Sequence, residues 1–338
     1  MTDSISNQRI LLAHGNGGRY MRELIAEIFA RHLANPALNT DADAVYLPDL
    51  SGDVMITTDG FTVQPLEFPG GNLGSLAVHG VVNDLAVAGA EPRYATLSAI
   101  IEEGLEIATL DRLIASFAQA AQENGLQVAA GDTKVVRHGE GGGVYLSVAG
   151  IGVRRATQAL SMTSIQPGDA VLVSGSVGDH GIAVMLAREQ FGLSGNLQSD
   201  SDSVLPLARV VWNLPGIRFM RDPTRGGLAT VCHEIARATG HNVVVEQARI
   251  PVREEVQSVC DMLGYDPYFL ACEGRIVAIV NANAAETVLQ AWQSLPGGKD
   301  AKQIGRVEPG KAQVILETEL GGRRFLDELE DDPLPRIC

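Results

Sequence analysis

Residues 53–90 read DVMITTDGFTVQPLEFPGGNLGSLAVHGVVNDLAVAGA and contain two segments of different apolar period. The first segment, residues 53–63, is rich in β-branched residues, which favours a β-strand. In the second segment, residues 74–90, apolar residues recur at helical spacing, namely Leu76, Val81, Val82 and Leu85. A strand followed by an apolar helix is typical of a protein that mixes the two structures. We therefore predict an α+β or α/β fold.

The same periods predict elements on both sides of this stretch. A helix is expected over residues 20–34, and a clearer one over residues 109–124, with Thr109 as its N-cap and Gly125 just after its end. Strands are expected near residues 126–136 and 144–153. Beyond Arg154 strands and helices alternate again. Strands are predicted at 170–174, 217–221, 242–246, 275–281, 302–307 and 313–318, and helices at about 180–191, 203–213, 226–238, 252–263 and 285–295.

The restart of the pattern after Arg154 places a domain boundary near residue 155, in keeping with a length of 338 residues. We expect a glycine-rich segment and helix over residues 1–40, an N-terminal domain over 41–154 and a layered α/β domain over 155–325. Residues 326–338, LDELEDDPLPRIC, are acidic and carry two prolines with little apolar periodicity. They are expected to form a flexible tail.

Composition excludes several classes of protein. Lys and Arg number 26 against 41 Asp and Glu, a net charge of -15, which disfavours nonspecific binding to nucleic acid or to anionic membranes. No apolar run approaches the roughly 20 residues of a membrane span, and the N-terminus lacks a signal-peptide pattern, so we expect a cytoplasmic protein. Four cysteines without a CxxC pair indicate reduced thiols rather than disulfides or structural zinc. A polyanionic ligand such as ATP would require divalent cations beside so acidic a chain.

Aspartates follow several apolar segments in turn-forming sequences. They are Asp59 in TTDG, Asp84 in NDLAVAGAEP, Asp132 in GDTKVV and Asp222 in RDPTRGGL. Each alone is typical of an Asx turn or a helix cap. Because Mg²⁺ is held by a few carboxylates together with phosphate oxygens, the four together indicate a nucleotide and magnesium site.

Glycine-rich segments provide a second candidate feature, at residues 14–18, 175–181 and 224–227. Exposed N–H groups at a helix start bind anions, and Arg225 there can bind a phosphate, although each cluster is also typical of a tight turn. No Walker A motif and no GxGxxG after a strand is present.

Cys338 is the last residue, after Pro335-Arg336-Ile337, and it is not in a prenylation motif. From Gly321 the tail would reach up to ~60 Å at about 3.3 Å per residue. The thiol is either a carrier on a swinging arm or an incidental cysteine.

These motifs, in this order, resemble the ATP-dependent superfamily of aminoimidazole ribonucleotide synthetase, selenophosphate synthetase and thiamin-phosphate kinase. Within it the sequence resembles the HypE family of hydrogenase maturation factors, whose ending PRIC sets it apart from the relatives. The resemblance covers nearly the whole chain, through HGNGGR (14–19), TTDGFTVQPLEFPGGNLG (57–74), NDLAVAGAEP (83–92), GDTKVV (131–136), SGSVGDHGIAVM (174–185), RDPTRGGL (221–228) and PRIC (335–338).

The resemblance implies a function and partners. In that family the carbamoyltransferase HypF loads a carbamoyl group onto the C-terminal thiol. The HypE protein then dehydrates the thiocarbamate to a thiocyanate, using ATP to turn the carbonyl oxygen into a phosphate leaving group. The resulting cyanide passes to iron on the HypC–HypD complex. The resemblance also implies a homodimer whose N-terminal domains pair their strands into a barrel-like core, with ATP and Mg²⁺ bound near the subunit interface.

The same resemblance assigns roles to individual residues. Cys338 is the carrier, Lys134 neutralises the transferring phosphoryl group and Glu273 is the base for the amide protons. Asp59, Asp84, Asp132 and Asp222 are implied as magnesium or nucleotide ligands, with the cofactor-binding residues Asn83, Thr133, Thr224, Arg225 and Gly226 nearby. His14 either closes over phosphates or caps the helix that follows.

Two alternative functions remain open from the sequence. One is a small-molecule kinase or synthetase of the same superfamily, in which the tail has no catalytic part. The other is a scaffold that binds a nucleotide to regulate assembly and catalyses no reaction.

Overall fold

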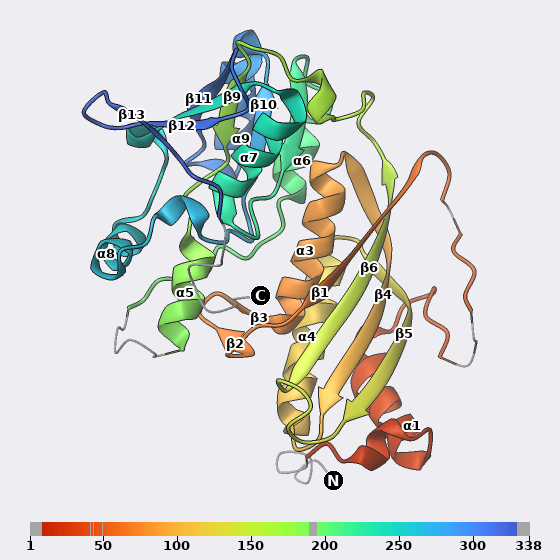
Figure 1. Cartoon of the computed structure of the whole chain (residues 1–338). Coiled ribbons are helices and arrows are strands. Elements are labelled where there is room, and N and C mark those ends of the chain that lie inside the picture. The colour runs from red at the N-terminus through yellow and green to blue at the C-terminus, as the bar shows by residue number, and fades with distance from the viewer. Residues whose placement is uncertain (1–8, 41, 43, 49, 189–194, 330–338) are drawn as a thin grey trace. The chain divides into compact units, whose positions relative to one another are not determined.

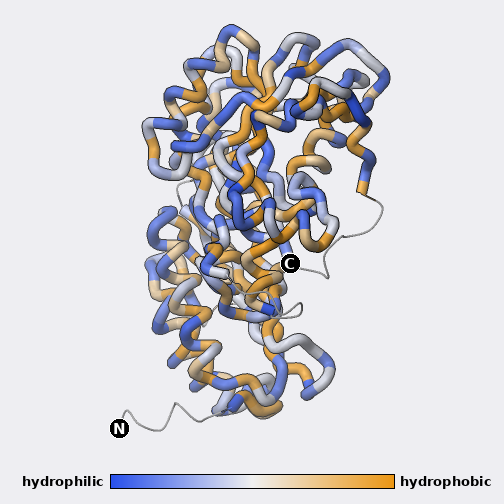
Figure 2. The backbone as a smooth tube through the Cα atoms, turned by 90° about the vertical axis from the view of Figure 1, so that its left-hand side faces the viewer, coloured by the Kyte–Doolittle hydropathy of each residue, from blue (hydrophilic) through white to orange (hydrophobic). Residues whose placement is uncertain are grey.

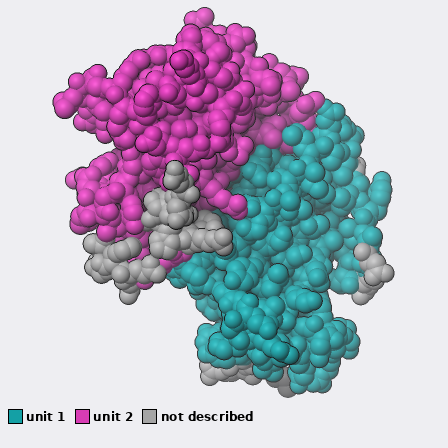
Figure 3. Space-filling model, in the orientation of Figure 1, with its two compact units in different colours: residues 1–85, 91–153, 338 teal, residues 86–90, 154–337 magenta. Residues whose placement is uncertain are grey.

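A computed structural model describes residues 9–40, 42, 44–48, 50–188 and 195–329. These residues form two compact units, drawn in different colours in Figure 3. Unit 1 holds the described residues up to Leu85 together with 91–153, and unit 2 holds 86–90 and the described residues from Arg154 onward. The buried residues are mostly hydrophobic, and Figure 2 shows hydrophobic and hydrophilic stretches alternating along the backbone. None of the helices described is long and apolar enough to cross a membrane.

Unit 1 contains a four-stranded sheet of order β1-β6-β4-β5. Its strands are β1 (Val54–Phe61), β4 (Ala90–Glu102), β5 (Gln127–Val136) and β6 (Val144–Arg154). β1 runs antiparallel to β6, and β4 runs parallel to β5. The helices α3 (Leu73–Val87) and α4 (Ile107–Glu123) lie on one face of this sheet (Figure 1). A short hairpin, β2 (Glu67–Phe68) and β3 (Gly71–Asn72), leads into α3 and is not foreseen by the sequence pattern.

The apolar helix α3 is buried on several sides at once, as its composition suggests. Leu76, Val81 and Val82 are fully buried. Two glycines allow close packing: a Cβ at Gly74 would lie 1.9 Å from the Leu113 carbonyl oxygen of α4, and one at Gly80 would lie 2.5 Å from the Phe61 ring of β1. The helix α3 therefore packs against both α4 and β1 at distances that only glycine permits.

The other face of the sheet carries exposed apolar side chains. Val54 and Ile56 of β1 are 51% and 73% exposed, and Ile100 of β4 and Tyr145 of β6 also remain accessible. Strand alternation separates them from Phe61, which points toward α3. One face of this sheet is thus covered by helices, while its opposite face is partly apolar and open in the single chain.

The N-terminal helix and α4 differ in detail from expectation. The predicted helix 20–34 is continuous, but it consists of α1 (Arg19–Leu24), a π-helical segment η2 (Ile25–Ala30) and α2 (Arg31–Leu33). The start predicted for α4 is wrong, because Glu106 rather than Thr109 occupies the N-cap position. Backbone bridging of Arg9 to Glu106 fixes the chain just ahead of the helix. Gly125 has a φ of 66°, which confirms it as the residue after the C-cap.

Unit 2 contains a seven-stranded sheet of order β13-β12-β9-β11-β7-β10-β8. Neighbouring strands are antiparallel except β12 and β9, which are parallel. The strands are β7 (Ala170–Val173), β8 (Ile217–Arg221), β9 (Asn242–Glu246), β10 (Val277–Val280), β11 (Lys302–Glu308), β12 (Val314–Glu317) and β13 (Arg323–Phe325). The helices are α5 (Asp179–Ala187), α6 (Leu205–Val211), α7 (Gly227–Thr239), α8 (Glu254–Leu263) and α9 (Ala285–Gln293).

The strands β7 and β10 are buried at every residue because helices cover both faces of the sheet. Val171 and Val173 share a core with Ile235 of α7. The other face meets α9, whose Trp292 is fully buried and donates its indole N–H to the Leu207 carbonyl of α6 at 3.0 Å. The sequence predicts both strands, at residues 170–174 and 275–281, and the two covering layers explain why every residue of β7 and β10 is apolar.

The last described residues pack into the core of unit 2, to which they belong. Leu326 is 2% exposed in the unit 2 core, its N–H donates to the Val314 carbonyl at 3.0 Å, and its own carbonyl contacts His233 Nε2 at 2.8 Å. Glu328 pairs with Arg237. The tail boundary predicted at residue 326 therefore lies inside a packed segment, and β13 just before it was not predicted. The end of the helix predicted over 180–191 and residues 330–338 of the predicted tail lie outside the described residues.

Candidate functional site

The residues selected from the sequence fall in both units. Unit 1 contains Asp59, Asn83, Asp84, Asp132, Thr133 and Lys134, and unit 2 contains Asp222, Thr224, Arg225, Gly226 and Glu273. Cys338 lies outside the described residues.

Asp59 and Asp84 lie on the helix-covered side of the unit 1 sheet. The hydroxyl of Thr57 on β1 donates to Asp84 Oδ2 on α3 at 2.6 Å, which fixes one oxygen of that carboxylate. Asp59 is two residues from Thr57 and shares its face of β1, and its Oδ1 accepts the Gly60 N–H at 2.8 Å. Asn83, next to Asp84 on α3, is 1% exposed. Thr57, which sequence reasoning did not select, thus orients a candidate ligand.

Asp132 and Lys134 occupy β5, the edge strand opposite β1. Three strand spacings separate the two edges, roughly 14 Å. Asp132 and Lys134 are exposed, whereas Thr133 between them is buried and its hydroxyl has no hydrogen-bond partner among the described residues. The sheet of one chain therefore holds Asp59 and Asp132 apart.

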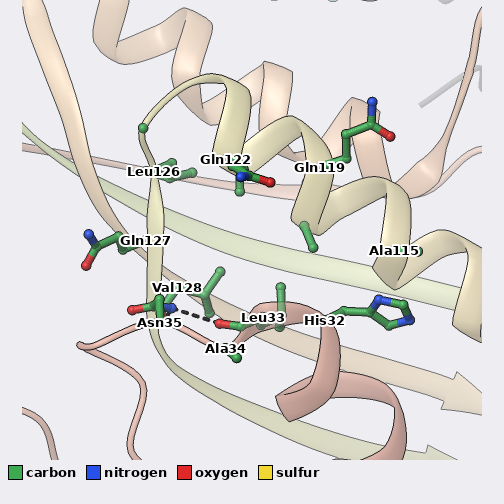
Figure 4. Close-up of a pocket in the computed structure, with 13 residues that line it drawn as sticks. His32, Leu33, Ala34, Asn35, Ala115, Gln119, Gln122, Leu126, Gln127 and Val128 are labelled. Atoms are coloured by element: carbon green, nitrogen blue, oxygen red, sulfur yellow. Dashed lines mark hydrogen bonds between the residues drawn. The ribbon is translucent and has the colours of Figure 1, made fainter.

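Two cavities of unit 1 help to locate these residues. A small one of about 90 Å³ lies among Met21, Ile25 and Phe29 of the N-terminal helix and reaches Asp132 and Thr133. A larger one of about 540 Å³, shown in Figure 4, is lined by amide and small side chains such as Gln119 and Gln122, and by none of the residues selected from the sequence. Asp132 and Thr133 of β5, which are expected to bind the nucleotide, therefore line the smaller cavity.

The glycine-rich segment 14–18 begins beside β5. A Cβ at Gly15 would lie 2.9 Å from the Val135 backbone nitrogen, so the segment approaches the strand next to Lys134. The ring of His14 accepts the Leu11 N–H at 2.9 Å and caps the short helix η1 (Leu12–Gly15), to which it belongs. Of the two roles weighed for His14, this contact supports a local cap, on η1 instead of the helix after it.

In unit 2, RDPTRGGL turns the end of β8 into the start of α7. Gly226 is the N-cap residue with a φ of 68°, and Gly227 has a φ of 59° and packs against the Leu270 carbonyl. Asp222 is buried and Arg225 is exposed. An exposed guanidinium at the N-terminus of a helix of 13 residues suits a phosphate.

Glu273 lies in the segment between η5 (Pro267–Phe269) and β10 and is 5% exposed. The Glu273 and Gly274 N–H groups donate to the two oxygens of Asp200, at 3.2 and 3.3 Å. The preceding thiol, Cys272, accepts the Gly178 N–H at 3.2 Å, and burial raises its pKa well above the usual value. This thiol is therefore a packed, protonated group and not a nucleophile.

The segment 175–181 is a tight turn whose N–H groups are used inside the protein. Val177 donates to the Pro251 carbonyl, Gly178 to the Cys272 thiol and Gly181 to the Ala271 carbonyl. Asp179 at the start of α5 is fully buried and pairs with Arg253 at 2.9 Å and with Arg275 at 3.4 Å. Of the two interpretations weighed for this cluster, the structure supports the turn.

Sequence reasoning did not select Asp179, Asp200 or Arg275. Asp179 lies within the glycine-rich segment 175–181, but the sequence gives it no separate role. Asp200 lies in a loop that has no apolar period. Arg275 comes two residues after Glu273, and nothing in the sequence around it distinguishes it from a surface arginine. In the described residues no three His, Cys, Asp or Glu side chains are gathered as a ready metal site.

Residues 40–154 match the N-terminal domain of AIR synthase related proteins, and residues 166–317 match their C-terminal domain. Carbamoyl dehydratase HypE of Azotobacter vinelandii is 43% identical over 99% of this chain and 98% of its own. A crystal structure of the hydrogenase maturation protein HypE in complex with ATP has a TM-score of 0.92 at 42% identity, over 97% of this chain and 99% of that one. A HypE–HypF complex has a TM-score of 0.79 at 40% identity, over 90% and 99%.

The two layered units and the matched domains define an AIR synthase related protein, which confirms the predicted fold class. Within that class the chain belongs to the HypE carbamoyl dehydratase family, as the sequence motifs indicated. The described sheet of unit 1 is open, and no closed barrel exists among the described residues of one chain.

Burial of His180 makes stability depend on pH. His180 is fully buried on α5, with Nδ1 2.8 Å from the Ser199 hydroxyl, and burial lowers its pKa to about 3. Since the unfolded chain binds this proton near pH 6.5 and the folded chain does not, stability is present above pH 6.5 and is lost as pH falls toward 3. We expect His180→Gln to remove up to about 1.4 kcal/mol per pH unit from the slope of unfolding free energy against pH.

Urea unfolding of both proteins between pH 7 and pH 4 measures this slope. The same substitution at His138, whose side chain is 86% exposed, is the control for the loss of an imidazole at the surface. Equal slopes for wild type and His180→Gln would contradict the burial argument.

Proposed function

We propose that this chain is an ATP-dependent carbamoyl dehydratase that converts a thiocarbamate on Cys338 into a thiocyanate, the cyanide source for the iron of nickel-iron hydrogenase. The observation that carries this proposal is the 43% identity to a carbamoyl dehydratase HypE over 99% of this chain and 98% of that protein. The ATP complex of a similar HypE, at a TM-score of 0.92, supports ATP as the phosphoryl donor.

The proposed reaction balances without an oxidant. The carbonyl oxygen of R–S–C(=O)–NH₂ attacks the γ-phosphorus, the bond to ADP breaks, and an N–H proton leaves to give R–S–C(=NH)–OPO₃²⁻. Removal of the second N–H proton and departure of phosphate then give R–S–C≡N. Phosphoryl transfer is needed because the oxygen of an amide-like carbonyl is a poor leaving group. Removal of each N–H proton needs a base within hydrogen-bond distance of the carbamoyl nitrogen.

Residues of both units have roles in this proposal. Lys134 supplies positive charge to the transferring phosphoryl group, and Glu273, which is buried, accepts the N–H protons. Arg225 and the start of α7 bind phosphate, with Thr224 and Gly226 in the same turn and Asp222 just before it. In unit 1, Thr133 and Asn83 are the residues expected to bind the nucleotide.

The donor set fits magnesium, which binds one or two carboxylates together with phosphate oxygens. Asp59 and Asp84 share one side of the unit 1 sheet, and each has one oxygen fixed by a neighbouring donor. We infer that they hold the ion, with Asp132 and Asp222 as further candidates. When bound, the ion neutralises phosphate charge.

The proposal includes three protein partners and a second copy of the chain. A complex of a similar HypE with HypF supports HypF as the protein that loads the carbamoyl group. The HypC–HypD complex is the expected acceptor of cyanide. The open face of the unit 1 sheet supports a homodimer, since exposed apolar side chains such as Ile56 favour burial against a partner.

The carrier role of Cys338 can be tested by intact-mass measurement. Incubation with the carbamoyltransferase and carbamoyl phosphate should add the mass of one carbamoyl group to wild type, and later addition of ATP should remove the mass of one water. Cys338→Ala should show neither change, because no other thiol is accessible: Cys232, Cys260 and Cys272 are buried.

The control is Cys260→Ala, which should still undergo both mass changes. A chain that lacks residues 335–338 but still turns over ATP with a small substrate would instead favour a small-molecule kinase. Both adducts on Cys338→Ala would contradict the carrier role.

Replacement of Ile56 by Asp tests the dimer. Ile56 is 73% exposed in the single chain, so burial against a partner would stabilise the wild type, and a carboxylate in that place would lose hydration. We expect the dimer dissociation constant to rise at least roughly 100-fold. Light scattering across a concentration series measures it. Met262→Asp on α8, exposed at 61%, is the control, and unchanged mass for Ile56→Asp would contradict this interface.

A further inference from the structure

A buried ion-pair network in unit 2 surrounds the backbone of residues 273–275. Asp200 and Asp179 have no exposed side-chain surface, and Arg275 has 11%. Arg275 Nε lies 3.5 Å from Asp200 Oδ2, and its Nη2 lies 3.4 Å from Asp179 Oδ2. Arg253 joins through its 2.9 Å contact with Asp179. Such charges are tolerated out of water only when each has partners, so the network constrains every segment that contributes to it.

Asp200 holds the N–H side of the Glu273 segment. One oxygen accepts the Glu273 N–H at 3.2 Å and the other accepts the Gly274 N–H at 3.3 Å, so a single carboxylate spans two successive peptides. The segment has no strand or helix at these residues, and these bonds replace the ladder that it lacks. An ionised acceptor makes stronger hydrogen bonds than a neutral one.

Arg275 holds the carbonyl side of the same segment. Its Nη1 donates to the Gly274 carbonyl at 3.1 Å, while Nε donates to the Ser176 carbonyl at 2.9 Å. Residue 274, which both Asp200 and Arg275 contact, must be glycine, because a Cβ at this position would lie 1.9 Å from the Asp200 carbonyl oxygen. Gly274, the residue after Glu273, is thus bound through both its N–H and its C=O groups.

We propose that Asp200 and Arg275 are positioning residues for Glu273: together they fix the backbone from which its carboxylate reaches the carbamoyl nitrogen. This inference rests on the proposed function of Glu273 as the base. Proton transfer requires the base within hydrogen-bond distance of the proton, and an error of about 1 Å in its place costs roughly 100-fold in rate. The network therefore acts on the proton-transfer step and not on nucleotide affinity.

The test uses the full chain, carbamoylated at Cys338, in single-turnover reactions with ATP followed by intact mass. Asp200→Asn keeps the shape of the side chain but leaves one oxygen instead of two to accept the paired N–H groups. We expect the rate of water loss to fall roughly 10- to 100-fold, with the half-saturating ATP concentration changed less than about threefold. Asp202→Asn makes the same chemical change two residues away, at an exposed side chain, and should match wild type.

A double variant separates positioning from general destabilisation. If Asp200 acts through Glu273, then adding Asp200→Asn to Glu273→Gln should lower the remaining rate less than about twofold. A further 10-fold loss in that background would overturn the proposal, as would a normal rate for Asp200→Asn alone. Should Asp200→Asn fail to fold, Arg275→Lys replaces it in both backgrounds, since lysine keeps the charge but lacks the fork that binds the Gly274 carbonyl.

The controls distinguish failure of this inference from failure of the proposed function. No water loss from carbamoylated wild type would overturn the dehydratase activity itself. Water loss at the wild-type rate in Glu273→Gln would overturn the role of Glu273 and, with it, the positioning role of Asp200. Water loss that needs Glu273 but proceeds normally in Asp200→Asn would overturn the positioning role alone.

Discussion

Charges buried in unit 2 have to be neutralised by one another, and the backbone around Glu273 depends on that requirement. Asp179, Asp200 and Arg275 come from three separate segments of the chain, so their pairing brings those segments together. Removing one partner from such a network typically costs 3–5 kcal/mol, because a charge remains without compensation. Burial also raises the pKa of Asp179, which makes its cationic neighbours necessary if it is to stay ionised. A network of this kind contributes less to net stability than to a single arrangement of the loops that it joins.

In unit 1 the positions of the candidate site residues are determined by the two faces and the two edges of its sheet. Helices α3 and α4 cover one face, and the glycines of α3 allow the close contact. The carboxylates of Asp59 and Asp84 lie on that side, whereas Asp132 and Lys134 lie on the opposite edge strand. Because the open face keeps apolar side chains such as Ile56 in solvent, the same sheet that separates the polar groups of one chain offers a surface for a second copy.

Much of this fold could be predicted from the sequence, because the spacing of apolar residues shows which side chains of a helix or strand face the core. The unbroken apolar runs of β7 and β10 and the helical stripe of α4 are such cases. The π-helical segment Ile25–Ala30 and the short strand β13 could not be predicted, because neither changes the period over enough residues. Thr109 was wrongly predicted as the N-cap of α4. The backbone bridge between Arg9 and Glu106, a tertiary contact, makes Glu106 the N-cap instead. The motifs indicated Asp84 and the family resemblance indicated Glu273, yet Thr57, Asp200 and Arg275 can be recognised only where the fold brings distant residues together.

The central claim is that ATP activates the carbonyl oxygen of the carbamoyl group on Cys338, and isotope transfer tests it most directly. The chain is loaded with a carbamoyl group whose carbonyl carries heavy oxygen, ATP is added for one turnover, and the inorganic phosphate and water are analysed by mass. The account predicts that the label appears in inorganic phosphate, in an amount equal to the thiocyanate formed. Thiocyanate accompanied by unlabelled phosphate, with the label in water, would contradict it.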